Sequence, residues 1–97
     1  MIPREILSAA LKTYGAEAQT LMVMEEMSEL TKELCKNARG ADNTDAIAEE
    51  IADVYIMLRQ MEILHDCSDR VMHWFDVKLA RLACRLKGAG KDAGTGN

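Results

Sequence analysis

The chain has 97 residues, enough for one domain with a small hydrophobic core. Its formal net charge of −4, from 16 acidic and 12 basic residues, is opposite to the excess of a protein that binds nucleic acid by neutralising phosphates. Aromatic residues make up only 4% of the chain, while Ala, Leu, Met, Glu and Lys are frequent. This composition favours an all-α protein and argues against a β-sandwich or barrel.

Neither the apolar segments nor the cysteines indicate a membrane or an oxidising compartment. No apolar run reaches the roughly 18 residues of a membrane span, and the first residues lack the pattern of a signal peptide. The three cysteines, Cys35, Cys67 and Cys84, form no CxxC pair. We therefore expect reduced thiols that serve packing in a cytoplasmic protein.

The first half of the chain reads as a short helix followed by a long one. Pro3 suits the first turn of a helix, and apolar residues repeat with helical spacing as far as Tyr14. Gly15 interrupts that pattern. The next helix is expected from about Ala16 to Ala38, with Gly40 as its stop signal.

Two more long helices are predicted in the second half. Asn43 or Thr44 is a candidate cap for a helix that ends near His65. Ser68 or Asp69 starts the last helix, and the glycine-rich tail 88–97 is expected to be disordered. Three stripes are expected to face the core: Val23, Met27, Leu30, Leu34 and Ala38; Ile47, Ile51, Val54, Leu58 and Met61; Val71, Phe75, Leu79, Leu82 and Leu86.

These elements predict an all-α fold for residues 1–87: an antiparallel bundle of one short and three long helices. A single copy of this size buries little area per residue. The methionine-rich stripes therefore predict that the bundle is completed by oligomerisation, as a dimer or tetramer of this chain.

Two acidic clusters, at 25–29 and 49–53, do not fit an ordinary solvated helix face. Each contains carboxylates three residues apart, Glu26 with Glu29 and Glu50 with Asp53, so each helix presents two of them side by side. Both pairs lie within or beside the expected apolar stripes. Clustered buried carboxylates need a compensating charge, and oxygen-only ligands favour Mg²⁺, with Mn²⁺ as a second possibility.

Two other interpretations compete at this point. The acids are compatible with a non-catalytic helical interaction module in which they form salt bridges between helices. A carboxylate-bridged di-iron protein would need two Glu-x-x-His pairs, and the sequence offers one such spacing, Glu62 to His65.

The acidic pattern resembles that of the MazG-like nucleoside triphosphate pyrophosphohydrolases, within the all-α NTP pyrophosphatase superfamily. The family pattern EExxE, spacer, ExxD is read here as Glu25-Glu26-x-x-Glu29, twenty residues, then Glu50-x-x-Asp53. The flanking segments EEMSELTKELCK and AEEIADVYIML are also similar, and the resemblance spans about residues 16–86.

The resemblance implies a dimer or dimer of dimers and Mg²⁺-dependent cleavage between the α- and β-phosphates of a nucleoside triphosphate, giving a monophosphate and pyrophosphate. It implies that the catalytic metal ligands are Glu26, Glu29, Glu50 and Asp53. The role of Glu25 stays open between supporting the ligands and a purely structural one.

Substrate-binding residues follow from charge and position, and in part from the resemblance. Lys78, Arg81 and Lys36 are candidates for holding the phosphates, although Lys78 can also extend to solvent and Lys36 can be an ordinary surface charge. Family members often have Asn two residues before the lysine, where this chain has Asp76. Gln19 is a candidate for hydrogen bonding to the base or sugar, and Trp74 for stacking on the base, with core packing as the alternative for Trp74.

Overall fold

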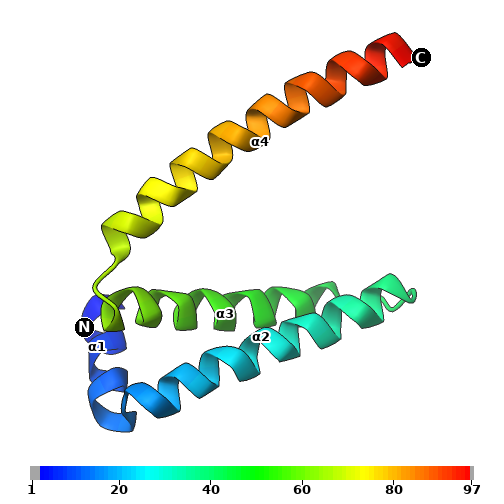
Figure 1. The fold of residues 1–97 in the computed structure, drawn as a ribbon. Helices are drawn as coiled ribbons and strands as arrows, with labels where there is room; N and C mark the ends of the chain where they lie inside the picture. Colours follow the sequence, from blue (N-terminus) through cyan, green and yellow to red (C-terminus); the bar gives the residue numbers. More distant parts are fainter. Residues whose placement is uncertain (1–2, 97) are drawn as a thin grey trace. The chain divides into compact units, whose positions relative to one another are not determined.

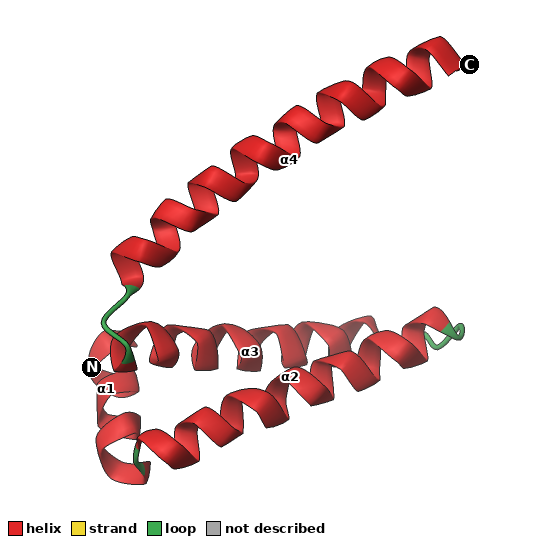
Figure 2. Ribbon diagram, in the orientation of Figure 1, coloured by secondary structure: helices red, strands yellow, loops and turns green. Residues whose placement is uncertain are grey.

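The computed structural model describes residues 3–96, with side chains for residues 3–89. It contains the helices α1 (Pro3–Tyr14), α2 (Ala16–Ala38), α3 (Thr44–Leu64) and α4 (Ser68–Gly96), and no strand occurs within residues 3–96 (Figure 1). Only short loops join them (Figure 2). The prediction of an all-α chain with one short and three long helices is confirmed. Helices α1, α2 and α3 form one compact unit, and α4 belongs to a second.

Two glycines set the limits of α2. Gly15 has a φ of 91° and Gly40 a φ of 101°, which favour a residue without a Cβ atom. After α2, the Gly40 amide donates to the Asn37 carbonyl at 2.9 Å and the Ala41 amide to the Lys36 carbonyl at 3.0 Å. This pair of bonds is a Schellman motif, and it reverses the chain between α2 and α3.

Helices α2 and α3 run antiparallel and pack along their lengths, and α1 packs against the same pair (Figure 1). We call their contact line the α2–α3 seam. Its α2 side chains include Gln19, Val23, Glu26, Leu30 and Glu33, and its α3 side chains include Glu50, Asp53, Val54, Met57 and Gln60. All ten are buried or half-buried.

The buried face of α3 differs from the predicted stripe. Val54 was expected inside and is buried, but its buried neighbours are Met57 and Gln60, while Ile51 and Leu58 are exposed. In α2, Val23 is buried, whereas Met27 and Leu34 are exposed. The predicted apolar stripes of α2 and α3 lie on faces next to the seam and not at its centre. Acidic and amide side chains occupy several of the inner positions, which a hydrophobic pattern assigns to the outside.

The described apolar side chains of α4 are largely exposed. The five residues of its expected stripe are all exposed in the single chain, from 39% for Val71 to 62% for Leu86. The stripe itself is present, since these residues recur every three or four positions.

The C-terminal segment continues as helix, since α4 passes through Gly88 and ends at Gly96. The side chains of residues 90–97 lie outside the described part of the chain, so a disordered tail from Gly88 stays a prediction. Within the described residues, no helix is both long and apolar enough to cross a membrane.

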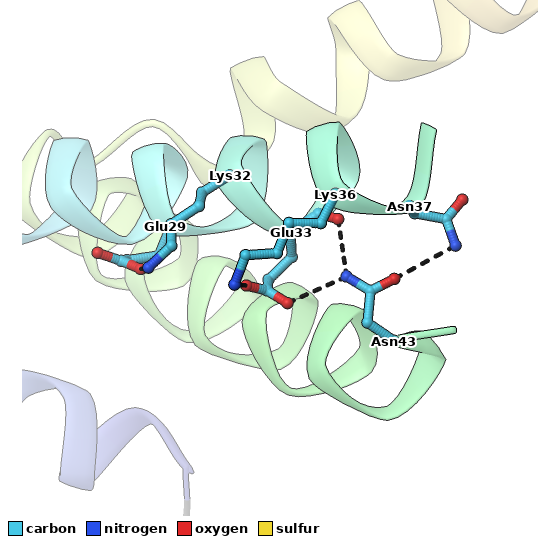
Figure 3. Close-up of polar contacts among 6 residues, drawn as sticks. All are labelled: Glu29, Lys32, Glu33, Lys36, Asn37 and Asn43. Carbon is cyan, nitrogen blue, oxygen red and sulfur yellow. Dashed lines mark hydrogen bonds and ion pairs between the residues drawn. The ribbon is translucent and has the colours of Figure 1, made fainter. Parts of the chain in front are cut away.

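A side-chain network braces the loop end of the α2–α3 hairpin, where α2 ends and α3 begins (Figure 3). Asn43 stands at the N-cap of α3 but makes no side-chain capping bond. Its amide nitrogen instead donates to the Glu33 carbonyl at 2.8 Å and to the Glu33 carboxylate at 3.0 Å, and its oxygen accepts from Asn37 at 3.3 Å. The expected cap residue therefore ties the start of α3 to the last turns of α2.

We expect Asn43→Ala to destabilise the protein by about 1–2 kcal/mol, because a half-buried amide loses two bonds to Glu33, one of them to a charged group. Asn43→Ser should cost a similar amount, since serine can cap α3 but is too short to reach Glu33. Urea unfolding followed by circular dichroism measures both. Asn37→Ala is the matched control, because its bonds are long and exposed; an equal loss in that variant would contradict the assignment.

Candidate metal centre

Three carboxylates from the two acidic motifs meet in the middle of the α2–α3 seam. Glu26 of α2 and Glu50 and Asp53 of α3 each offer an oxygen, and these oxygens lie within 4.8 Å of one another. All three side chains are half-buried. Residues 24 to 27 positions apart in the sequence are thus brought together by the antiparallel pairing of the two helices.

The three carboxylates have no cationic partner within ion-pair distance among the described residues. The pKa of Glu26 is raised, first by desolvation and then by the charge of Asp53 and a hydrogen bond between the two carboxyl groups. The pKa of Glu50 is also raised, first by desolvation and then by the charges of Asp53 and Glu29. Both shifts express the cost of holding like charges together away from water.

Among the three carboxylates, Glu50 most clearly lacks a hydrogen-bond or metal partner. Its Oε2 atom is buried and has no hydrogen-bond partner. Buried carboxylate oxygens normally accept hydrogen bonds or coordinate metals. A divalent cation between Glu26, Glu50 and Asp53 would give this oxygen a partner and offset two of the three negative charges, and an oxygen-only donor set suits Mg²⁺ or Mn²⁺.

The fourth predicted ligand, Glu29, lies outside this cluster of three. Its carboxylate is 3.8 Å from the Lys32 ammonium, one turn along α2, in a largely exposed pair (Figure 3). It still contributes to the raised pKa of Glu50. An exposed pair at this spacing is worth only a few tenths of a kcal/mol, about 0.3–0.5, so it holds Glu29 weakly in its present position.

Lys36, predicted to bind phosphate, is engaged with another acid. Its ammonium lies 3.1 Å from the Glu33 carboxylate (Figure 3). The pKa of Glu33 is lowered, first by the hydrogen bond from Asn43 and then by Lys36, so this carboxylate stays charged. The sequence left Lys36 open between a phosphate contact and an ordinary surface charge, and an acid three residues before it indicates a pair along the helix. Its role toward phosphate stays a prediction.

The other predicted substrate-binding residues fall in two places. Gln19 is buried in the seam, seven residues before Glu26 on the same line of α2. Lys78, Arg81 and Trp74 are exposed on α4, where Trp74 makes an edge contact with His73 at a centroid distance of 5.4 Å. Their roles toward a substrate stay predictions.

Sequence reasoning overlooked three residues of the seam, Glu33, Met57 and Gln60, and the last of these has an unpartnered polar atom. Gln60 is 4% exposed, and its Oε1 atom is buried without a hydrogen-bond partner. Its signal in the sequence was its position seven residues after Asp53, which places it two turns further along the same face of α3. For the di-iron alternative, the structure puts His65 at the exposed end of α3, and the carboxylate cluster contains no histidine.

Comparison of the chain with protein-family models, with curated proteins and with solved structures returned no match. The resemblance to the MazG-like pyrophosphohydrolases therefore rests on the motif residues themselves. What the coordinates add is the meeting of Glu26 with Glu50 and Asp53.

We expect the stability of the metal-free protein to fall between pH 4.5 and the raised pKa values of Glu26 and Glu50. A carboxyl group whose pKa is raised from 4.5 holds its proton more tightly when folded, so its contribution is complete below pH 4.5 and is lost as the pH rises through the folded value. Glu50→Gln should remove part of this loss and raise the melting temperature near pH 7. Thermal unfolding at several pH values in the presence of a chelator measures it.

Glu49→Gln is the matched control for this measurement. Glu49 is the neighbouring residue on α3, and its side chain is exposed. If both variants change the pH dependence equally, the cause is the overall charge of the protein and not the carboxylate cluster.

Proposed function

We propose that this chain is a Mg²⁺-dependent nucleoside triphosphate pyrophosphohydrolase of the MazG-like kind, which cleaves (d)NTPs between the α- and β-phosphates. The observation that carries the proposal is the meeting of Glu26, Glu50 and Asp53 with their oxygens within 4.8 Å of one another. These three residues come from the two motifs on which the family resemblance rests. Gathering three carboxylates in the seam of a helical hairpin costs free energy unless a cation or a proton compensates their charge.

The donor set favours Mg²⁺, with Mn²⁺ as an alternative, since all the converging atoms are carboxylate oxygens. In this proposal Glu26, Glu50 and Asp53 hold the metal, and Glu29 joins them by leaving its weak pair with Lys32. The bound metal supplies Lewis-acid polarisation of the phosphoryl group and lowers the pKa of a water molecule.

The protein's own groups would then bind and orient the substrate. A triphosphate is strongly anionic, so carboxylates alone would repel it, and cationic side chains must hold the phosphates that leave. Helix α4 is the best source of these cations, since it carries six of the twelve basic residues of the chain and three of its sixteen acids. Lys78 and Arg81 are the proposed phosphate contacts, and Trp74 is the proposed stacking residue.

Incubation with a panel of (d)NTPs and Mg²⁺ tests the reaction. We expect a nucleoside monophosphate and pyrophosphate, separated by ion-exchange chromatography, and no products in the presence of a chelator. A diphosphate with orthophosphate would reject the proposed bond, and no hydrolysis of any nucleotide with either metal would reject the enzyme.

Glu50→Gln should reduce kcat by at least about a hundredfold, because it removes a ligand charge at the reacting phosphate while leaving the helices intact. Glu17→Gln is the matched control, since Glu17 is an exposed acid at the start of α2. Circular dichroism verifies that both variants keep their helical content. Full activity of Glu50→Gln would contradict a metal centre at this cluster.

We also propose that the protein is a homo-oligomer, as a dimer or a tetramer. Exposed large apolar side chains support this proposal, including Phe75, Leu79 and Leu82 on α4 and Ile51 and Tyr55 on α3. A soluble monomer rarely leaves so many large apolar side chains in contact with water. Among the side chains that the structure describes, the buried hydrophobic residues are Val23, Val54 and Met57.

Light scattering at micromolar concentration should therefore give a mass at least twice the 10.8 kDa of one chain. Phe75→Ser should shift this mass toward the monomer, because a polar side chain weakens apolar packing. Lys87→Ser is the control, since Lys87 is an exposed polar residue of the same helix. A monomeric wild-type protein would contradict the proposal.

The same apolar surface favours a second candidate function, a non-catalytic helical interaction module. In that case the carboxylates would have no catalytic role, and Mg²⁺ would neither stabilise the protein nor support hydrolysis. The nucleotide panel, combined with melting temperatures with and without Mg²⁺, separates the two functions.

A further inference from the structure

The two glutamines of the chain, Gln19 and Gln60, are both buried in the α2–α3 seam. Gln19 is 7% exposed and Gln60 is 4% exposed. Apart from these two, the described polar side chains are all half-buried or exposed. Glutamine is mostly a surface residue, so two of them inside one small hairpin require an explanation.

The register of the helices places the two glutamines in one layer. Glu26 of α2 meets Asp53 of α3, and seven residues back along α2 and seven forward along α3 lead to Gln19 and Gln60. The Thr20 hydroxyl lies 4.0 Å from the Met61 sulfur, which agrees with this register. Seven residues are two helical turns, so the amide layer lies about 10 Å from the carboxylates along the seam.

The Gln60 side chain has an unmet hydrogen-bonding requirement. Its Oε1 atom is buried and accepts no hydrogen bond. The other orphaned acceptor among the described side chains is Glu50 Oε2, in the carboxylate cluster. Helix α3 thus carries an anionic acceptor that needs a cation at Glu50 and, almost three turns further on, a neutral acceptor at Gln60 that needs an N–H or O–H donor.

We propose that Gln60, supported by Gln19, is the subsite for the nucleoside part of the substrate and accepts a hydrogen bond from a donor on its base or sugar. The inference rests on the proposed function, which places the α-phosphate at Glu26, Glu50 and Asp53. The spacing of two turns matches the extent of a nucleoside beyond its α-phosphate. Because this oxygen is covered, the proposal requires the Gln60 side chain to change its rotamer when the donor binds.

Gln60 then determines specificity without taking part in the chemistry. A site that offers an acceptor prefers substrates with a donor at that point, and it rejects analogues whose acceptor would face the glutamine oxygen. A purely structural amide layer, which fixes the register of the two helices, would not distinguish among substrates.

Steady-state kinetics of Gln60→Met separates these roles, because methionine keeps the length of the side chain and removes the acceptor. We expect KM for the preferred nucleotide to rise about tenfold with kcat little changed, and discrimination among the (d)NTPs to decrease. Hydrolysis of inorganic tripolyphosphate, which has no nucleoside, should be unaffected. Met57→Leu, between the two layers, is the control and should leave both substrates unchanged.

Equal effects on the nucleotide and on tripolyphosphate, or no change in KM for any nucleotide, would overturn the subsite. If Gln60→Met fails to fold, NMR of the wild-type protein tests the subsite without a substitution. Selective ¹⁵N labelling of glutamine gives two side-chain amide signals, one from each residue. With Mg²⁺ present, a nonhydrolysable nucleoside triphosphate should shift the Gln60 signal, and tripolyphosphate should not.

The outcomes for the two proposals are distinguishable. A protein that hydrolyses nucleotides while its glutamine signals stay unmoved would retain the proposed function and lose the Gln60 subsite. A protein that neither binds nor hydrolyses any nucleotide would lose both.

Discussion

Three carboxylates held together in the seam between two helices are the constraint on which the rest of this structure depends. Glu26, Glu50 and Asp53 repel one another and lack a cationic partner among the described residues. The raised pKa values of Glu26 and Glu50 reflect the free-energy cost of desolvation and of this repulsion. A shared proton or a bound cation would relieve this repulsion, and the cation is the solution that we propose.

The loop between α2 and α3 fixes the register that brings the three carboxylates together. The Schellman turn at Gly40 sets the reversal of the chain, and the bonds from Asn43 to Glu33 fix the start of α3 against the end of α2. Together they set the register in which Glu26 faces Asp53. A shift of one residue would rotate α3 by about 100°, because there are 3.6 residues in a turn, and would move Asp53 out of the seam.

Placing polar groups in the seam has a consequence for the apolar ones. Inner positions occupied by Gln19, Glu26 and Glu50 are unavailable to hydrophobic side chains, so residues such as Ile51 and Leu58 lie on the outer faces. One chain alone therefore has a small core and a large apolar surface. The proposed assembly and the proposed metal centre are thus linked: the same arrangement that concentrates charge inside the hairpin leaves apolar surface for another copy.

The sequence by itself determined the number of helices and the limits of α2, because Gly15, Gly40 and the spacing of apolar residues act locally. It also determined that Glu50 and Asp53 share a face, which follows from a separation of three residues. Only the tertiary structure decided that Glu26 joins them while Glu29 pairs with Lys32, that Asn43 binds Glu33 instead of capping α3, and that Gln60 is buried. These outcomes depend on the rotation of each helix about its axis and on the register between helices. Both are set by packing between residues distant in the sequence, and hydrophobic periodicity alone assigns charged and amide side chains to the outside.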